Sequence, residues 1–379
     1  MNTNINFVDL KRQYSTIKSE VQDAISRVLD DTAFAAGPYV KEFETNFARA
    51  HGVGYCVGVN SGTSALHMAM MALNIGAGDE VIVPTNTFFA TAEAVSLAGA
   101  TPVFVDCEEK FYNINYKEIE NAITKKTKAV IAVHLYGQSA NLDEIKTITN
   151  KYNLHLIEDC AQAHLAEYKG RMVGGDGIIS CFSFYPGKNL GAYGEAGAVL
   201  TNNEELYSKC LALRDHGSKV KYYHDYIGHN YRMEGIQGAV LNVKLKHLNK
   251  WTDLRRRNAS LYVRYLEECK EIILPQESLD AKHVYHLFVI RERSASRDKL
   301  MKYLAERKIF TGIHYPIPCH LQKAYAHLEY KKGAITGVGA GAFKNAERFA
   351  EEIISLPMYA ELTEEEVKYV STTIKGFYE

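Results

Sequence analysis

A single lysine stands in a glycine-rich segment between two apolar runs of the sequence. The segment SFYPGKNLGAYGEAGAV, residues 183–199, follows the apolar run GIISCF and leads into GAVLT. A lysine held in a partly desolvated turn loses part of its preference for the charged form. A neutral amine can condense with an aldehyde to form a Schiff base. Lys188 therefore presents two alternatives, a turn that simply reaches solvent or an amine that reacts.

Two further segments carry groups that complement such an amine. NSGTSAL, residues 60–66, joins an apolar run to a helical pattern, so the amides of Gly62, Thr63 and Ser64 would point outward from a helix N-terminus. Such amides bind phosphate, although the segment also fits an ordinary helix cap. Asp159 ends the apolar run HLIEDC, where a buried carboxylate is costly unless it is paired. Its partner is either a structural cation or a cationic ring nitrogen.

A phosphate-binding segment, a carboxylate and an amine, in this order along the chain, are the three groups needed to bind pyridoxal phosphate. They would contact its phosphate, its ring nitrogen and its aldehyde, and its ring acts as an electron sink. Ser183, just before the lysine turn, can supply a hydroxyl to the phosphate. Gln162 follows Asp159 closely and can reach the same pocket. Phe88 offers a flat surface to stack on the ring, with a core phenylalanine as the alternative interpretation.

Short apolar runs alternate with helical patterns in the first part of the chain. This alternation predicts an α/β domain with a mixed, mostly parallel seven-stranded sheet flanked by helices. The last two runs are too close together for a helical crossover, so one antiparallel strand is expected. The predicted strands are residues 55–59, 81–87, 102–106, 129–137, 155–160, 177–184 and 197–201.

The pattern changes after about residue 245, where a long charged helical stretch begins. Shorter strands and helices follow, including two amphipathic helices predicted over residues 343–358 and 363–377. We therefore predict a large domain over residues 1–245 and a smaller α+β domain over residues 246–379. The glycine-rich segment 333–343 is predicted to be a loop.

The composition excludes several classes of function. The net charge is -1 and no run of about 18–20 apolar residues occurs, which argues against nucleic-acid binding and against a membrane span. The N-terminus lacks the apolar core of a signal peptide. The 7 cysteines form no Cys-x-x-Cys pair, which favours free thiols and a cytoplasmic location. No spacing of metal-ligating residues suggests a metal site.

Nine segments of the chain together resemble one enzyme family, the DegT-type sugar-nucleotide aminotransferases, a branch of the fold type I pyridoxal phosphate enzymes. They are FAAGPYVKEFE, GVNSGTSAL, GDEVIVPTNTFFATAEAV, ATPVFVD, LIEDCAQAH, FSFYPGKNLGAYGEAGAV, RDHG, HNYRM and IHYPIPCH. The resemblance extends from about Phe7 to Pro357. It implies the fold type I architecture, pyridoxal phosphate as cofactor, and a homodimer with active sites at the subunit interface.

The resemblance also implies a role for each matching residue. Lys188 would form the Schiff base and carry the proton, Asp159 would pair with the ring nitrogen, and Gln162 would approach the ring hydroxyl. The remaining cofactor-binding residues, with Asn230 coming from the neighbouring subunit, would be Gly62, Thr63, Phe88, Ser183 and Asn230. The substrate-binding residues would be Tyr185, Tyr222, His314, Tyr315 and His320.

The lysine segment is most similar to that of family members that aminate a dTDP-linked 3-keto-6-deoxyhexose. These members use L-glutamate as donor and produce a dTDP-3-amino-3,6-dideoxyhexose. Amination at carbon 4 of a nucleotide-linked 4-keto sugar is an open alternative. A pyridoxal phosphate enzyme acting on amino acids and a regulatory or binding protein are two others. Lys188 itself favours transamination over the dehydratase subgroup, in which histidine replaces this lysine.

Overall fold

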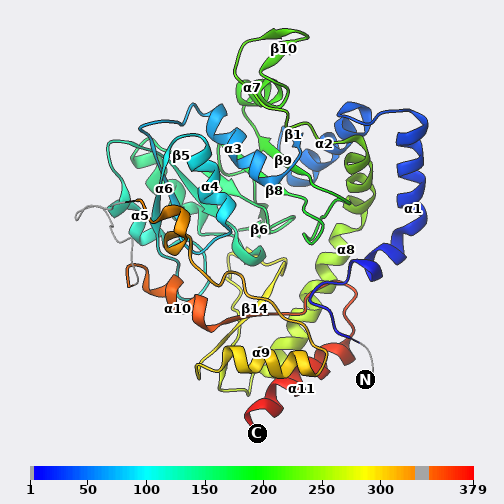
Figure 1. The fold of residues 1–379 in the computed structure, drawn as a ribbon, viewed down its shortest axis with the longest axis vertical. Coiled ribbons are helices and arrows are strands. Elements are labelled where there is room, and N and C mark those ends of the chain that lie inside the picture. The colour runs from blue at the N-terminus through cyan, green and yellow to red at the C-terminus, as the bar shows by residue number, and fades with distance from the viewer. Residues whose placement is uncertain (1–3, 329–340) are drawn as a thin grey trace.

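A seven-stranded sheet lies at the centre of the larger part of the molecule (Figure 1). The computed structural model describes residues 4–328 and 341–379. The strand order is β1-β9-β8-β5-β4-β2-β3, and β9 runs antiparallel to both of its neighbours while the other pairs are parallel. The predicted mostly parallel sheet with one antiparallel strand is confirmed. The strands are β1 Tyr55–Val59, β2 Glu80–Pro84, β3 Thr101–Val105, β4 Thr127–Val133, β5 His155–Asp159, β8 Ile179–Ser183 and β9 Gly197–Thr201.

Both faces of this sheet are covered by helices, which explains why its strands are almost continuously apolar. Val81 and Val83 belong to one hydrophobic cluster and Ile82 to another, because alternate side chains of a strand point to opposite faces. The first cluster includes residues of α3 Gly62–Ala72 and α4 Phe89–Leu97, and the second includes residues of α5 Tyr116–Ala122 and α6 Leu142–Lys151. The other helices of this part are α1 Leu10–Asp30, α2 Gly37–His51 and α7 Glu204–Arg214.

A second, three-stranded sheet organises the C-terminal part of the chain in the order β12-β14-β15. The chain enters this part through the long helix α8, Gly235–Leu266, which runs unbroken past residue 245. The C-terminus lies at this end of the molecule (Figure 1), and Ile5, near the start of the described chain, pairs with Ile309. The predicted domain division at residue 245 stays a prediction. The elements after α8 are β12 Ile272–Ile273, β14 Phe288–Glu292, α9 Arg297–Glu306, α10 Lys344–Glu352, β15 Ile353–Leu356 and α11 Glu364–Tyr378.

The helix predicted over residues 343–358 is shorter than expected. α10 ends at Glu352, and Ile353–Leu356 forms β15, which pairs antiparallel with β14. All four residues of β15 are buried, and two of them are β-branched isoleucines, which suit a strand inside a sheet. The amphipathic helix pattern therefore stops where both faces of the chain become covered.

Several short elements complete the described chain. One hairpin, β10–β11, projects from the body of the molecule beyond α7 (Figure 1). No helix within residues 4–328 and 341–379 is long and apolar enough to cross a membrane. Residues 333–340 of the predicted glycine-rich loop lie outside the described residues. The short elements are β6 Glu167–Tyr168, β7 Arg171–Met172, β10 Ser218–Val220, β11 Tyr223–His224, β13 Ala281–Lys282, and the 3-10 turns Leu135–Gly137, Cys319–Leu321 and Lys323–Tyr325.

Candidate active site

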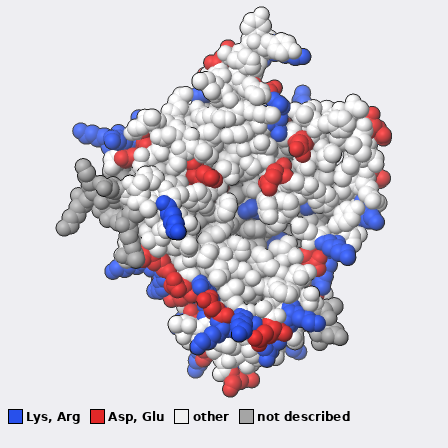
Figure 2. Space-filling view, in the orientation of Figure 1, with Lys and Arg blue, Asp and Glu red and all other residues white. Residues whose placement is uncertain are grey.

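A cavity of about 840 Å³ opens at the carboxyl edge of the large sheet. Val133, Asp159 and Ser183, the last residues of β4, β5 and β8, all line it. This edge is where open α/β sheets bind ligands. Figure 2 shows a hollow in the middle of one face with separate acidic and basic side chains around it, whereas charged side chains gather more densely over α9 and α10. The predicted site residues that line the cavity are Gly62, Thr63, Phe88, Asp159, Gln162, Ser183, Tyr185, Lys188, His314 and Tyr315.

Lys188 is carried by a tight loop between β8 and β9. Its backbone amide donates to the carbonyl oxygen of Tyr185 at 2.8 Å, and the amide of Ala192 donates to the carbonyl oxygen of Phe184 at 2.8 Å. Burial lowers the pKa of the Lys188 amine to about 8, while the nearby Asp159 acts in the opposite direction. The amine is therefore neutral in a substantial fraction of molecules near neutral to mildly alkaline pH, as a nucleophile requires.

Asp159 is held in place by two hydrogen bonds. Its Oδ2 accepts from the Thr91 hydroxyl at 2.8 Å, and its Oδ1 accepts from the Ala161 amide at 3.1 Å. The side chain is 4% exposed, and burial raises its pKa even though these two donors and Lys188 act to lower it. A cation placed beside this carboxylate would restore its ionised form.

The N-terminus of α3 presents free amides to the cavity. The Ser61 hydroxyl caps the helix by accepting from the Ser64 amide at 3.0 Å. The Ser64 amide, one of the three considered for phosphate binding, is therefore already hydrogen-bonded within the protein. Within the described part of the chain, the amides of Gly62 and Thr63 have no acceptor. A Cβ at position 62 would lie 2.6 Å from the Ser183 Cβ, so glycine is what lets the helix approach Ser183 this closely. These groups form an anion cradle.

Gln162 connects the cavity floor to the C-terminal part of the chain. Its Oε1 accepts from the Tyr136 amide at 2.6 Å, and its Nε2 donates to the Tyr315 hydroxyl at 3.0 Å. The first contact fixes which way the amide points, and one Nε2 hydrogen remains beyond the bond to Tyr315. Burial raises the pKa of the Tyr315 hydroxyl. Phe88 is 55% exposed, and its ring centre lies 5.5 Å from that of Tyr315 on the cavity wall.

Two imidazoles also line the cavity, of which only His314 was predicted. His314 forms a hydrogen bond to the Ser355 hydroxyl at 2.8 Å, and burial, aided by Lys188, lowers its pKa to about 4. His286 lies against Asn189, with its Nδ1 at 3.2 Å from the Asn189 Oδ1. Burial, again aided by Lys188, holds the pKa of His286 well below its ordinary value. Both rings are therefore neutral at physiological pH.

Sequence reasoning missed a few residues of the site. Thr91 orients Asp159, and Phe7 and Glu195 line the cavity from segments far apart in the sequence. Phe7 stacks on His314 with 5.3 Å between ring centres. Only the fold brings the N-terminal segment to this wall, so no local pattern could have revealed Phe7.

Three predicted site residues lie outside the cavity lining of this chain. His320 is 1% exposed, with its Nδ1 at 2.6 Å from the Thr85 hydroxyl and its Nε2 at 3.2 Å from Glu347. Tyr222 is 80% exposed at the end of the β10–β11 hairpin. Asn230 is exposed, and its carbonyl oxygen accepts from the Asn60 side chain at 3.4 Å. Their predicted roles stay predictions.

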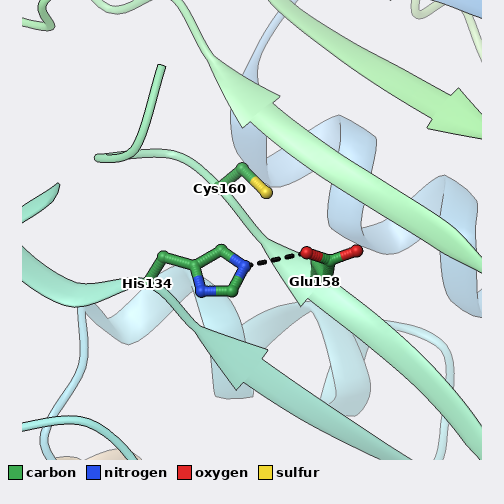
Figure 3. Close-up of side chains that lie close together, drawn as sticks. All are labelled: His134, Glu158 and Cys160. Carbon is green, nitrogen blue, oxygen red and sulfur yellow. Dashed lines mark hydrogen bonds and ion pairs between the residues drawn. The ribbon is translucent and has the colours of Figure 1, made fainter. Parts of the chain in front are cut away.

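A buried cluster beside Asp159 consists of His134, Glu158 and Cys160 (Figure 3). The Ala140 amide donates to His134 Nδ1 at 3.0 Å, so Nε2 carries the ring proton and donates it to Glu158 at 3.0 Å. Glu158 also accepts from the Gly177 amide at 2.6 Å. Both ring nitrogens of His134 are thus engaged in hydrogen bonds within the protein, as in a structural histidine.

The donor set fits the three parts of the expected cofactor. The cradle of Gly62, Thr63 and Ser183 suits a phosphate, Asp159 suits a protonated ring nitrogen, and the Lys188 amine suits an aldehyde. A cavity of about 840 Å³ also lies in the range usual for ligand sites.

Comparison with known proteins gives consistent results over the whole chain. A family model described as the DegT/DnrJ/EryC1/StrS aminotransferase family matches residues 15–375. A pleiotropic regulatory protein of Geobacillus stearothermophilus is 43% identical over 99% of both chains. A UDP-N-acetyl-3-dehydro-alpha-D-glucosamine 3-aminotransferase of Acidithiobacillus ferrooxidans is 43% identical over 99% of this chain and 98% of the other.

A further relative and a solved structure are similarly close. A dTDP-3-amino-3,6-dideoxy-alpha-D-galactopyranose transaminase of Aneurinibacillus thermoaerophilus is 42% identical over 98% of this chain and 99% of the other. The crystal structure of DesV from Streptomyces venezuelae in complex with a ketimine intermediate has a TM-score of 0.94 and 40% identity. That comparison covers 100% of this chain and 99% of the other.

Proposed function

This chain belongs to the DegT/DnrJ/EryC1/StrS aminotransferase family and is a pyridoxal phosphate-dependent sugar-nucleotide aminotransferase, and from this premise we propose its substrates. The amino donor is L-glutamate, and the acceptor is a dTDP-linked 3-keto-6-deoxyhexose, which becomes a dTDP-3-amino-3,6-dideoxyhexose. The observation that carries this proposal is the 42% identity, over nearly the full length of both chains, to a dTDP-3-amino-3,6-dideoxy-alpha-D-galactopyranose transaminase.

A second acceptor is supported by an equally similar relative. The 3-aminotransferase of Acidithiobacillus ferrooxidans, 43% identical, acts by its name on a UDP-linked N-acetyl sugar. Both names place the amine on carbon 3, so the two candidates differ in the nucleotide and in the substituents of the sugar. A relative called a GDP-perosamine synthase is less similar, at 36% identity.

Each group of the cofactor has a proposed partner in the cavity. Pyridoxal phosphate, when bound, supplies a ring that withdraws electrons from the bond being broken. The Lys188 amine attaches the cofactor, and Asp159 keeps the ring nitrogen protonated. Ser183 and the amides of Gly62 and Thr63 hold the phosphate, which their free donors and mutual proximity support. Phe88 stacks on the ring and Gln162 donates to the ring hydroxyl.

Lys188 is also the proposed proton carrier of both half-reactions. With pyridoxal phosphate bound, the Lys188 amine would take up the proton that leaves the α-carbon of glutamate. In the second half-reaction the same amine works in reverse at carbon 3 of the sugar. A pKa of about 8 supports this double role, because both protonation states are accessible near neutral pH. One base serving two substrates in turn predicts ping-pong kinetics.

We further propose a homodimer in which each subunit completes the other's cavity. Asn230 and the Tyr222 hairpin are exposed in one chain, which leaves them free to contribute to a second copy. Tyr185, His314 and Tyr315 line the cavity and are the proposed sugar contacts within one chain. A cytoplasmic location is proposed because all seven cysteines are free and buried.

The acceptor is tested with purified holoenzyme, L-glutamate and a panel of 3-keto and 4-keto sugars carried on dTDP or UDP. Release of 2-oxoglutarate measures turnover, and NMR of the product locates the amine. We expect amination at carbon 3 of the dTDP-linked sugar. Turnover restricted to UDP-linked sugars would show that the nucleotide of the substrate is UDP and not dTDP. An amine on carbon 4 of the product would show that the enzyme is a 4-aminotransferase. No exchange of the amino group with glutamate would instead favour a regulatory protein.

A further inference from the structure

A lysine that takes no part in the proposed chemistry lies buried behind the Lys188 loop. Lys244, on the third turn of α8, is 1% exposed. Its ammonium donates to the carbonyl oxygen of Gly191 at 2.5 Å and lies 5.0 Å from the centre of the Tyr193 ring. Among the residues that the structure describes, no carboxylate lies within ion-pair distance of the amine, although Glu361 is near enough to favour its charged form against the effect of burial. A buried ammonium without a carboxylate partner is costly, so its contacts need an explanation.

Gly191, the partner of Lys244, closes the loop that carries Lys188. The Ala192 amide donates to the Phe184 carbonyl oxygen, so residues 185–191 leave and return at nearly the same place. A Cβ at Gly191 would lie 2.3 Å from the carbonyl oxygen of Pro186, which shows how closely the two ends of the loop approach. We call the point where the two ends of the loop meet, at Phe184 and Ala192, the neck of the loop. A hydrogen bond to the Gly191 carbonyl oxygen therefore holds the loop at its neck, three residues from Lys188.

Two neutral side chains hold the same loop at other points. The Tyr193 amide donates to the Gln237 Oε1 at 3.0 Å, and the Asn189 Nδ2 donates to the Val284 carbonyl oxygen at 3.1 Å. These contacts are amide–carbonyl bonds of ordinary strength. Lys244 supplies the charged donor of the set, and charge-assisted hydrogen bonds are roughly twice as strong as neutral ones.

We propose that Lys244 is a positioning residue for Lys188. By holding the Gly191 carbonyl, it fixes the neck of the 185–191 loop and with it the place of the Lys188 amine relative to Asp159. An unbranched apolar side chain of similar length would fill the same space without burying a charge. The hydrogen bond to the Gly191 carbonyl oxygen is therefore the reason for an amine at this position. The inference rests on the role of Lys188 under the proposed function.

The test compares two lysines of the same helix in the full-length holoenzyme. Lys244→Met keeps the volume and removes the donor, whereas Lys246→Met makes the same change at an exposed position. The measurements are the dissociation constant of pyridoxal phosphate, the pH midpoint of the absorbance of the bound cofactor, and the melting temperature.

We expect Lys244→Met to weaken pyridoxal phosphate binding by about tenfold, the scale of one lost hydrogen bond to a charged donor. The pH midpoint should shift by about half a unit, because the Lys188 amine sits in a less fixed environment. The melting temperature of the cofactor-free protein should change little, since removal of the buried charge and loss of the donor to the Gly191 carbonyl act in opposite directions. Lys246→Met should change none of the three.

Unchanged binding and an unchanged pH midpoint in Lys244→Met would overturn the inference, as would a lower melting temperature as the sole effect. If Lys244→Met does not fold, Lys244→Gln, whose N–H donor ends one bond short of the Gly191 carbonyl oxygen, is measured in the same way; weakened binding supports the inference and wild-type binding overturns it. Borohydride reduction of the wild-type holoenzyme with peptide mass analysis separates the two proposals. Cofactor fixed on another lysine contradicts the proposed function, whereas cofactor on Lys188 with no effect of Lys244 contradicts this inference alone.

Discussion

The Lys188 amine and the Asp159 carboxylate share one cavity, and burial disfavours the charged form of each. Burial raises the pKa of Asp159 and lowers that of Lys188, while each acts on the other in the opposite direction. A protonated ring nitrogen placed beside Asp159 would favour the carboxylate and leave the amine free to react. The two residues are thus poised for a cationic ring that bears an aldehyde.

The first prediction concerns the charge of Asp159. Asp159→Asn should retain the fold, because the new side-chain oxygen can still accept from Thr91 or from the Ala161 amide. The rate of the half-reaction with glutamate should fall by roughly 10²–10³-fold, the scale seen when a preorganised electrostatic contact is lost. Single-turnover absorbance measures the rate and thermal melting checks the fold. Asp23→Asn, on the exposed face of α1, serves as control, and an unchanged rate in Asp159→Asn would remove this residue from its role.

The second prediction concerns the pH dependence of Lys188. Its pKa of about 8 lies below the ordinary value of 10.5, so the neutral amine makes up half of the population at about pH 8 and most of it about one pH unit higher. The rate at which cofactor-free protein captures pyridoxal phosphate should therefore rise steeply below about pH 8 and level off above about pH 9. Stopped-flow absorbance measures this rate, with Nα-acetyl-lysine as the reference amine. A rate that keeps rising in parallel with the reference up to pH 10 would contradict the lowered pKa.

How far the site could be predicted depended on how unusual each residue is in its local sequence. Lys188 in a glycine-rich turn and Asp159 in an apolar run both break the local pattern, so both could be selected as candidates without a structure, and the structure places them in one cavity. Thr91 sits in an ordinary helix sequence, and its bond to Asp159 depends on where the fold places the start of α4 relative to the end of β5. His286 and Phe7 reach the cavity through contacts between distant segments, which a single sequence does not encode locally.

At the scale of elements, the site depends on how closely α3 approaches β8. The N-terminus of α3 points at the cavity only because Gly62 has no Cβ to meet Ser183. The same strand carries Ser183 at its end and leads into the Lys188 loop. A change in the α3–β8 distance would therefore move the proposed phosphate-binding groups away from the amine.

The third prediction tests this approach. Gly62→Ala should push α3 away from Ser183 and weaken binding of pyridoxal phosphate by about tenfold or more, since cradle amides lose their geometry. Binding of pyridoxal, which lacks the phosphate, should change much less. Fluorescence titration of both compounds gives the two dissociation constants. Gly376→Ala in α11, where the nearest atom to a new Cβ is 3.8 Å away, is the matched control. Equal losses for both compounds would contradict a phosphate-specific effect.

The elements of the large sheet were predictable because helices cover both of its faces. Continuous apolar runs and short connections indicated seven strands and the single antiparallel one, and the structure has all seven with shifted ends. The strand predicted over 129–137, for example, ends at Val133, and Leu135–Gly137 forms a 3-10 turn. The boundary between α10 and β15 was missed, because Ile353–Leu356 continues an apolar periodicity that a helix also satisfies. What makes it a strand is its pairing with β14, a contact between segments about sixty residues apart.

At the scale of the whole molecule, the cavity of one chain is poor in positive charge for the ligand proposed. Among its described lining residues, Lys188 is the one lysine or arginine. The two imidazoles are neutral, and Glu195 adds a negative charge. A nucleotide diphosphate needs donors or cations at its phosphates. Meanwhile the β10–β11 hairpin exposes Tyr222 and Tyr223, and Asn230 follows it on the surface. A second copy that inserts this segment would supply donors that the single chain lacks.

The last prediction asks whether Asn230 acts in its own cavity or in that of a partner. Two inactive variants, Lys188→Ala and Asn230→Asp, are mixed under conditions that exchange subunits. If Asn230 serves the partner, each hybrid dimer regains one site with both native residues, because Lys188 comes from one chain and Asn230 from the other. Equal mixing should then restore about a quarter of wild-type activity, since about half of the dimers are hybrids with one native site each.

The control mixes Lys188→Ala with Asp159→Asn, two residues that line the same cavity of one chain. In those hybrids every site lacks one of the two residues, so no recovery is expected, whatever the rate of exchange. Recovery with Asn230→Asp but not with Asp159→Asn would therefore locate Asn230 across a subunit boundary. If neither mixture recovers although mass spectrometry shows that hybrids have formed, Asn230 acts within its own chain, and the shared site is wrong. The exposed position of Asn230 in the single chain, away from the cavity lining, is the reason to expect the first result.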